Sequence, residues 1–399
     1  MAGKSDGDED TKETLNALLD YVPWEQRPKK PLSPDSYTKL SVLPNLMCNF
    51  SCSYCYSAKG RSSKELDFEH IKPMLDFFID PNRLEERKLS IFFAGGGEPV
   101  LSWPLLEESI IYADKLARKH GFSMYYKIIT NGAVINNRMI EFIKKYFVHL
   151  CVSFDILKDV QNEQRGSFQL VAHNIKTLIE NGVNPSISAT ITKSNVNRMP
   201  EMAEVLNQDF PEINNLNFDP VMDKSSFDSV EDLKAFYDTF VKNYFLAHEI
   251  WKNGDRGFNC TIRDKADVLA ERYCPGFLCL TPEGTISICH KLSSEKEEGF
   301  EAHQYGRIGS SGKIEFDLEK YVSLMQINVH KYKKCTDCFA KWHCAGGCMS
   351  YRNHFGEEMM DAVCHFHLNF FREIILRRLN AQILENTGQS LKETVLEAL

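Results

Sequence analysis

The stretch that decides the fold is Cys48-Asn49-Phe50-Ser51-Cys52-Ser53-Tyr54-Cys55, which carries three thiols at the spacing C-x3-C-x2-C. A cubane [4Fe–4S] cluster normally takes four thiolates, one for each iron, so three thiolates leave one iron open to another ligand. Structural zinc fits less well, because zinc takes four ligands and its motifs are usually built from C-x2-C pairs. The spacing therefore predicts an iron–sulfur cluster with an open iron, and the alternative is three unrelated buried thiols.

The chain around this stretch alternates strand-like runs with helical patterns from residue 37 onward. Such units form a parallel sheet with right-handed crossovers, and ligands collect where the strands end. Six units are too few for a closed eight-stranded barrel, so an open, partial barrel is expected. Strands are expected at residues 39–46, 89–94, 125–130, 149–154, 186–192 and 216–221, and helices at 68–79, 105–120, 137–146, 170–180, 199–206 and 230–251.

Length and composition bound the class of protein. The 399 residues suggest two or three domains, and an apolar content of 43% is ordinary for a globular protein. A formal net charge of -8 argues against nucleic acid as a partner, and no apolar run is long enough to span a bilayer. No signal peptide is recognised, so a cytoplasmic location without a membrane partner is expected. In a reducing compartment, 13 cysteines point to metal binding rather than to disulfides.

The cysteine spacing, with the aromatic Tyr54 directly before the third cysteine, resembles the radical S-adenosylmethionine (SAM) superfamily. The resemblance implies that Cys48, Cys52 and Cys55 hold a [4Fe–4S] cluster whose open iron chelates the amino and carboxylate groups of SAM, with Tyr54 beside the cofactor. It also implies an α/β fold with a TIM-like partial (β/α)6 barrel, in agreement with the alternation of strands and helices.

Two further segments match elements of the SAM pocket in that family. Residues 95–99 read Gly-Gly-Gly-Glu-Pro after the second strand, and glycine lets a backbone approach a ligand closely. By resemblance to the family's GGEP element, the SAM amino group would be gripped by Gly96, Gly97 and Glu98. Ser153 and Arg165 match the residues that reach the SAM ribose and carboxylate, and the planar Arg fork suits a carboxylate.

A second group of cysteines lies in the C-terminal third of the chain. Its spacing resembles the SPASM extension of peptide and protein maturases, which implies two auxiliary [4Fe–4S] clusters and three clusters in all. The distal auxiliary cluster would be held by Cys335, Cys338, Cys344 and Cys364. The nearer one would be held by Cys274, Cys289 and Cys348, with Cys260, which is slightly favoured, or Cys279 as the fourth ligand. A pair of zinc sites is the alternative.

The expected domain organisation follows from these motifs. Residues 1–36 are acidic at first and then contain prolines, which predicts a flexible lead-in too short for a winged-helix peptide-recognition module. Residues 37–240 would form the radical SAM core, and residues 241–365 a bridging region with a small cysteine-rich α+β SPASM domain. Apolar spacing predicts a docked C-terminal helix within residues 366–399.

Two residues depart from the family patterns. Ile156 stands where relatives often have glycine after the Asp of the Ser153 segment. His290 follows Cys289, where the similar sulfatase-maturating enzymes have an Asp that acts as the base. As a tentative catalytic residue, His290 could accept a proton near neutral pH, and the alternative is a histidine packed beside the cluster.

The resemblance implies an enzyme that forms a 5′-deoxyadenosyl radical from SAM and takes a hydrogen atom from a peptide or protein side chain. The expected outcome is an oxidative modification or a crosslink, as in ribosomal peptide maturation. A low-potential donor such as flavodoxin or ferredoxin would supply the electron, and a separate leader-peptide-binding protein could assist. The alternatives are an anaerobic sulfatase-maturating enzyme that makes formylglycine, and a non-catalytic iron–sulfur electron carrier or zinc-stabilised binding protein.

Overall fold

The computed structural model describes residues 33–251, 256–309 and 312–392. Most of the predicted N-terminal lead-in, residues 1–32, lies outside the described residues. Within them, no helix is long and apolar enough to cross a membrane. The expected cytoplasmic location stays a prediction.

A single sheet organises the described part of the chain, in the order β11-β10-β9-β8-β1-β2-β3-β4-β5-β6-β7. Strands β1 to β7 are consecutive parallel neighbours, as the alternating pattern predicts. The parallel strands are β1 (Lys39–Val42), β2 (Lys88–Phe93), β3 (Ser123–Thr130), β4 (His149–Ser153), β5 (Ser186–Ile191), β6 (Asn215–Pro220) and β7 (Gly257–Asn259).

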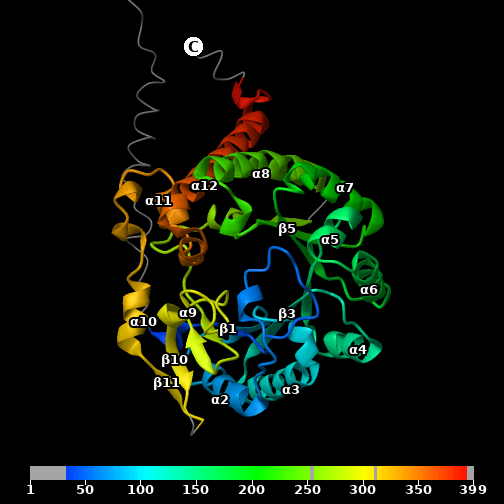
Figure 1. The fold of residues 1–399 in the computed structure, drawn as a ribbon, viewed down its shortest axis with the longest axis vertical. Coiled ribbons are helices and arrows are strands. Elements are labelled where there is room, and N and C mark those ends of the chain that lie inside the picture. Colours follow the sequence, from blue (N-terminus) through cyan, green and yellow to red (C-terminus); the bar gives the residue numbers. More distant parts are fainter. Residues whose placement is uncertain (1–32, 252–255, 310–311, 393–399) are drawn as a thin grey trace, which may run out of the picture. The chain divides into compact units, whose positions relative to one another are not determined.

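Helices cover one face of these strands and form an arc around them in Figure 1. In β2, Leu89, Ile91 and Phe93 are buried, whereas the alternate residues Ser90 and Phe92 stay partly exposed on the other face. The covering helices are α2 (Phe68–Phe78), α3 (Trp103–His120), α4 (Asn137–Tyr146), α5 (Lys158–Gln164), α6 (Phe168–Glu180), α7 (Met199–Asp209) and α8 (Val230–Trp251).

Local signals set several helix ends. Asp67 caps α2 by accepting a hydrogen bond from the His70 N–H, and Asn136 caps α4 in the same way from Met139. Helix α3 ends at Gly121, whose φ of 73° lies in the left-handed region that favours glycine. These helices therefore begin and end close to the predicted positions.

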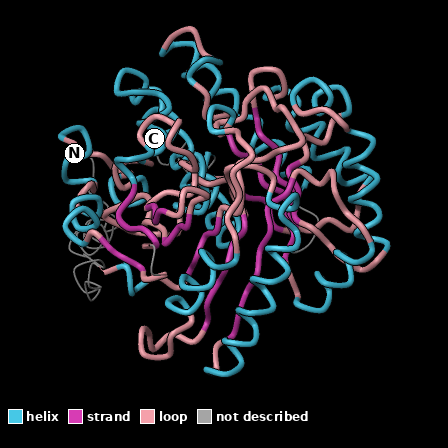
Figure 2. The backbone as a smooth tube through the Cα atoms, turned by 60° about the horizontal axis from the view of Figure 1, so that its bottom comes forward, coloured by secondary structure: helices cyan, strands magenta, loops and turns pink. Residues whose placement is uncertain are grey.

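The C-terminal third extends the same sheet. Strand β8 lies parallel to β1, with Leu40 opposite Leu278, and β9, β10 and β11 continue antiparallel beyond it. Figure 2 shows the strands of both regions together between the helices. The elements are β8 (Leu278–Leu280), β9 (Thr285–Ser287), α9 (Phe300–His303), β10 (Gln304–Ile308), β11 (Ile314–Phe316), α10 (Leu318–Met325), α11 (Lys341–Cys344) and α12 (Met349–Thr387).

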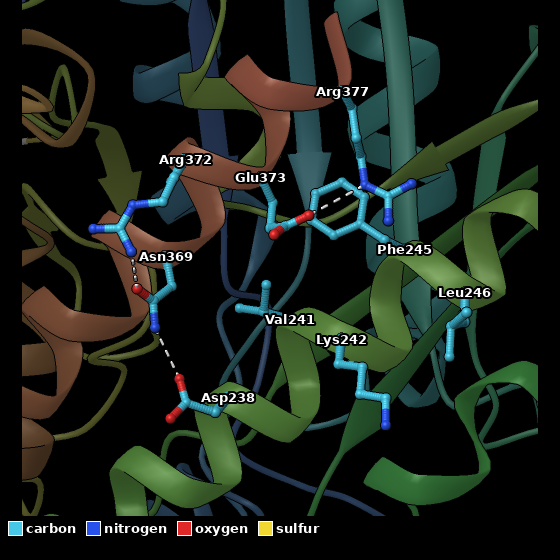
Figure 3. Close-up of a pocket in the computed structure, with 9 residues that line it drawn as sticks. All are labelled: Asp238, Val241, Lys242, Phe245, Leu246, Asn369, Arg372, Glu373 and Arg377. Carbon is cyan, nitrogen blue, oxygen red and sulfur yellow. Dashed lines mark hydrogen bonds and ion pairs between the residues drawn. The ribbon is translucent and has the colours of Figure 1, made fainter. Parts of the chain in front are cut away.

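Helix α12 is longer than the predicted C-terminal helix and packs against α8. It is interrupted at Gly356, which has non-helical backbone angles. The Phe366 ring stacks on Tyr237 of α8 with centroids 4.3 Å apart. Beside this contact, charged and apolar residues of the two helices line an outer hollow of about 390 Å³ (Figure 3). There the Asn369 amide donates to Asp238, and Arg377 pairs with Glu373.

Candidate active site

The loop that carries the first three cysteines leaves the end of β1 and is fixed at both ends. The Leu46 N–H donates to the Lys64 carbonyl, and the Leu66 N–H donates to Pro44. Within the loop, the Ser53 N–H donates to the Gln164 carbonyl at the end of α5. The loop therefore lies over the carboxyl ends of the parallel strands, which is the edge where ligands bind in such sheets.

Cys48, Cys52 and Cys55 are all partly exposed free thiols on this loop. Burial raises the pKa of Cys52, the nearby Arg165 lowers that pKa, and Cys55 and Cys48 raise it again. The structure thus brings the three predicted thiols together. The Arg165 guanidinium stands within electrostatic reach of Cys52.

Nitrogen donors surround these sulfur atoms. The Arg61 Nη2 donates to Cys55 Sγ at 3.2 Å, and its Nη1 holds the Phe50 carbonyl at 2.9 Å. The Asn131 side chain reaches Cys48 Sγ at 3.9 Å. Hydrogen bonds to thiolate sulfurs are one way in which proteins tune iron–sulfur clusters, so this donor set suits such a cluster. Arg61 was not predicted, although a basic residue soon after Cys55 is a signal that the sequence offers.

Tyr54, Asp155 and Arg165 form a polar chain beside the thiols, in which Asp155 is buried and the other two are half-buried. Tyr54 Oη donates to Asp155 Oδ2 at 2.7 Å, and Arg165 Nη1 donates to the same Tyr54 oxygen at 2.7 Å. Asp155 also accepts the Thr190 N–H at 3.1 Å. Burial raises the pKa of Tyr54, Arg165 lowers it and Asp155 raises it. Asp155 was not predicted as a site residue, although it directly follows the segment that contains Ser153.

Arg165 Nε is buried without a hydrogen-bond partner in the described structure. A buried donor left unpaired is costly, so a bound carboxylate at this guanidinium would be favourable. Ser153 ends β4, next to this chain of residues. The assignment of Ser153 and Arg165 to SAM stays a prediction.

The glycine segment after β2 packs backbone to backbone on the strand-to-loop connection. The Gly97 N–H donates to the Asn45 carbonyl, and the Glu98 N–H donates to Met47. A Cβ on Gly97 would lie 1.9 Å from the Met47 carbonyl oxygen. Gly96 has a φ of +67° and lies against Leu46 and Asn45. The close approach to the segment leading into Cys48 therefore requires glycine at position 97.

Glu98 is buried and already holds three protein donors. Its Oε1 accepts from Thr130 Oγ1 at 2.7 Å and from the Val100 N–H at 3.1 Å, and its Oε2 accepts the Asn131 N–H at 2.6 Å. Burial raises the pKa of Glu98, and these donors lower it. The carboxylate thus ties the ends of β2 and β3 together, and its predicted contact with SAM stays a prediction.

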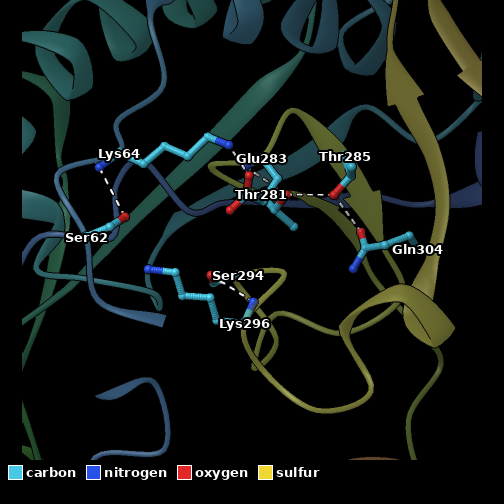
Figure 4. A network of polar contacts seen from close by, with 8 residues as sticks. All are labelled: Ser62, Lys64, Thr281, Glu283, Thr285, Ser294, Lys296 and Gln304. Carbon is cyan, nitrogen blue, oxygen red and sulfur yellow. Dashed lines mark hydrogen bonds and ion pairs between the residues drawn. The ribbon is translucent and has the colours of Figure 1, made fainter. Parts of the chain in front are cut away.

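The second cysteine region begins next to this site. The β8–β9 hairpin is tied to the cysteine loop by an ion pair between Lys64 and Glu283 (Figure 4). Thr285 joins the same polar network by donating to Gln304 at 2.7 Å. The His290 carbonyl oxygen lies 3.0 Å from the position of a Cβ on Gly95. The segment after Cys289 therefore packs directly on the glycine loop.

Cys274, Cys289 and Cys348 lie near one another although 74 residues separate the first from the last. Burial raises the pKa of Cys289 to about 12, with further upward shifts from Cys348 and Cys274. Burial raises the pKa of Cys279, and Cys289 raises it further. Burial also raises the pKa of Cys260, which Asp219 raises further and a hydrogen bond with Tyr244 lowers. Which of these two thiols completes the nearer group stays a prediction.

The four distal cysteines also lie together. Burial raises the pKa of Cys344, and Cys364, Cys335 and Cys338 each raise it further. His367, a buried residue that was not predicted, places its Nδ1 3.1 Å from Cys344 Sγ. Among the residues that the structure describes, no three His, Cys, Asp or Glu side chains are gathered as a single metal ion requires. A cubane places each thiolate on a different iron.

His290 is partly buried and its ring packs edge-on against Phe277 with centroids 4.5 Å apart. Burial, together with Lys291 and Lys39, lowers the pKa of His290 to about 3. Its Nδ1 has no hydrogen-bond partner in the described structure. A catalytic role for His290 stays a prediction.

Comparison with known proteins places this geometry in a class. Residues 42–206 match the family described as the radical SAM superfamily. The chain therefore contains a radical SAM domain, and such a domain takes a [4Fe–4S] cluster and SAM. The matched residues include the cysteine loop, the glycine segment and the end of β4, which are the elements that meet in the structure.

Particular relatives resemble much more of the chain. The radical SAM cyclopropyl synthase TigE of Paramaledivibacter caminithermalis is 24% identical over 92% of this chain and 80% of its own length. A cysteine-type anaerobic sulfatase-maturating enzyme of Clostridium perfringens is 21% identical over 84% of this chain and 95% of its own length. The structure of anSMEcpe with bound AdoMet and the Kp18Cys peptide has the same fold, with a TM-score of 0.65 and 17% identity over 84% of this chain and 98% of that one.

Proposed function

We propose that the protein is a radical SAM maturase with auxiliary clusters, which modifies a peptide or protein side chain by oxidation or crosslinking. One observation carries the proposal most directly: the Cys289 segment packs on the glycine loop of the radical SAM domain, because β8 is hydrogen-bonded to β1. A second cysteine group is thus built onto the first site. An oxidative outcome needs an acceptor for the electron that leaves the substrate, and a cluster held by these cysteines would supply one.

The residues of the chain have separable tasks in this proposal. When bound, the first cluster and SAM supply the electron and the 5′-deoxyadenosyl radical that removes a hydrogen atom. The Arg61 cation offsets the charge of the Cys55 thiolate, and the Asn131 amide donates to Cys48. Arg165 offers an unpaired N–H to the SAM carboxylate. The buried Glu98 holds the strand ends in place.

We propose three [4Fe–4S] clusters, with the ligands that the family resemblance implies. The grouping of Cys274 with Cys289 and Cys348, and of the four distal cysteines, supports this division. The proposed partners are a peptide or protein substrate and a low-potential donor such as flavodoxin or ferredoxin. A separate leader-peptide-binding protein is part of the proposal where the substrate carries a leader.

The test is formation of 5′-deoxyadenosine by the anaerobically reconstituted protein with dithionite and SAM. Cys52→Ala should abolish this product, because it removes one of three thiolates from the loop. Cys151→Ala is the matched control, since Cys151 is a buried thiol in β4 outside every proposed cluster. Absence of 5′-deoxyadenosine from fully loaded wild-type protein would refute the proposal.

Sulfatase maturation is the second candidate, supported by the C. perfringens relative, 95% of whose length is covered. It predicts that a sulfatase-derived peptide with a target cysteine is converted to formylglycine. The proposed reading predicts instead that such a peptide is left unchanged. His290→Ala with undiminished turnover would reject a proton-accepting role for that residue under either reading.

A further inference from the structure

Four side chains share the face of the sheet that the helices leave uncovered. They are Lys39 of β1, Phe92 of β2, Lys127 of β3 and His149 of β4, and each is partly exposed. Their neighbours along the strands, such as Leu40, are fully buried against the helices. Phe92 is directly opposite Lys127, and Lys127 is opposite His149. Alternation along parallel strands thus brings them to one place.

Two ammonium groups meet at one aromatic ring in this place. Lys39 Nζ lies 3.7 Å from the centroid of the Phe92 ring, and Lys127 Nζ lies 5.8 Å from the same centroid. Lys39 Nζ is also 5.6 Å from the ring of Phe277, just before β8. Aromatic faces attract cations, but they do not cancel the repulsion between two like charges.

Within the described residues, neither lysine has an ion-pair partner. Six other lysines of the chain each pair with a carboxylate. Burial lowers the pKa of Lys39, and Lys127 lowers it further. His149 supplies no negative charge to balance the two lysines. Burial and Lys127 lower its pKa, which favours the neutral imidazole. An unpaired cation pair is unexpected in a chain with a net charge of -8, so its place on this face needs a reason.

The nearer cysteine group accounts for only part of this arrangement. Cys274 raises the pKa of Lys39, but the lowering by burial and by Lys127 is larger. Arg272 and Lys265 also accompany Cys274 and lower its pKa. Two ammonium groups at one ring are therefore more positive charge than the cysteine group calls for.

We propose that Lys39 and Lys127 form an anion subsite that holds a carboxylate of the peptide substrate. The proposal rests on the proposed function, since it assigns substrate recognition to the face of the sheet that the helices leave uncovered. His149 and Ser153 lie on one face of β4, four residues apart, which is roughly 13 Å along a strand. If a carboxylate of the substrate binds at the lysines, a substrate side chain a few residues further along the peptide can therefore reach the strand ends near Ser153.

The test measures binding to the anaerobically reconstituted holoenzyme by calorimetry at constant ionic strength. N-acetylglycine presents a chain-end carboxylate, N-acetylglutamic acid α-amide presents a side-chain carboxylate, and N-acetylglycinamide is the neutral control. We expect saturable binding of at least one carboxylate and none of the neutral amide. The preferred carboxylate identifies whether the subsite takes a peptide terminus or an acidic side chain.

Lys39→Gln and Lys127→Gln should each weaken this binding by roughly tenfold or more, because each removes a charge-assisted hydrogen bond. Lys127→Arg should retain it, which separates lost charge from a disturbed fold. Lys115→Gln is the matched control and should bind like wild type, because Lys115 is an exposed residue of α3.

The proposal is overturned if neither carboxylate binds saturably to wild type, or if both lysine-to-glutamine variants bind as wild type does. Equal weakening in Lys115→Gln would also overturn it, since the effect would then be one of net charge. The same wild-type preparation is assayed for 5′-deoxyadenosine. Carboxylate binding without that product would defeat the proposed function and leave the anion subsite standing.

Discussion

Ile156 shows how a single residue can hold an unfavourable backbone angle at a functional turn. Its φ is +66°, in the left-handed region, and its side chain is fully buried. A β-branched residue is rarely found there, whereas the glycine that relatives often have at this position adopts such an angle without strain. Burial of the apolar side chain offsets the strain, so the turn after Asp155 is kept without glycine.

Ile156→Gly should therefore destabilise the protein. Relief of the left-handed angle contributes roughly 1–2 kcal/mol, whereas loss of a buried isoleucine costs roughly 2–5 kcal/mol. The control is Phe147→Gly, since Phe147 has a φ of 52° with an exposed side chain and only strain is relieved there. Thermal unfolding should show a lower Tm for Ile156→Gly and an equal or higher Tm for Phe147→Gly. A raised Tm for Ile156→Gly would contradict this balance.

Glu98→Gln should also lower stability, by about 1–3 kcal/mol, because an amide cannot accept all three donors that the carboxylate holds. The pH dependence has a defined sign. Burial raises the pKa of Glu98, so the folded protein holds this proton more tightly than the unfolded chain. This contribution to stability is therefore largest below the ordinary carboxyl pKa and is lost as the pH rises through the raised value.

Unfolding of wild type and Glu98→Gln between pH 4 and pH 7 checks this sign. The stability of wild type relative to Glu98→Gln should fall as the pH rises across that interval, because only wild type carries the titrating group. A difference independent of pH would show that Glu98 has the same pKa in the folded and unfolded states.

At the scale of elements, the approach of the glycine loop to the cysteine loop is the contact most sensitive to change. Gly97→Ala places a methyl group 1.9 Å from the Met47 carbonyl oxygen, so the two segments must separate. We expect a lower iron content after anaerobic reconstitution and loss of 5′-deoxyadenosine formation. Gly182→Ala is the control for backbone strain without a clash, because its φ of +78° disfavours alanine although nothing lies within 4 Å of its Cβ position. Full iron loading of Gly97→Ala would contradict the expectation.

The sequence predicts the elements best where they are long and regularly patterned. The expected ranges 137–146 and 230–251 coincide with α4 and α8. It fails for β7, because a run of three residues has no readable period. The pattern also predicts a hairpin over residues 277–289 with its turn at 282–284, and this hairpin is present as β8 and β9. Its attachment to β1 was not predicted, because the local pattern carries no signal for pairing between distant segments.

The candidate site was predictable where one segment carries several functional residues. The cysteine loop and the glycine segment are of that kind, and both lie at the strand ends as expected. Arg61 and His367 contact cysteine sulfurs through folding of the chain. A basic residue soon after Cys55 is the signal available for Arg61, whereas no spacing indicates the contact of His367. The break at Gly356 and the polar residues around Cys364 also hide the true start of α12.

At the scale of the whole molecule, α12 joins the C-terminal cysteine region to the radical SAM domain. Phe366 lies two residues after Cys364 and is buried between Tyr237 and Phe240 of α8. Phe366→Ala should cost roughly 3–5 kcal/mol of stability, as for other large core truncations. Leu384→Ala near the exposed end of α12 should change stability by less than about 0.5 kcal/mol. Similar Tm values for the two variants would show that α12 is not held by this contact.

The account depends above all on a three-thiolate cluster with an iron open to SAM. Electron paramagnetic resonance of the anaerobically reduced protein, recorded with and without SAM, tests this most directly. We predict a reduced-cluster signal that changes on addition of SAM in wild type and in Cys151→Ala, and that is missing from Cys52→Ala. The account would be contradicted if the wild-type spectrum did not change on addition of SAM, or if Cys52→Ala gave the same spectrum as wild type.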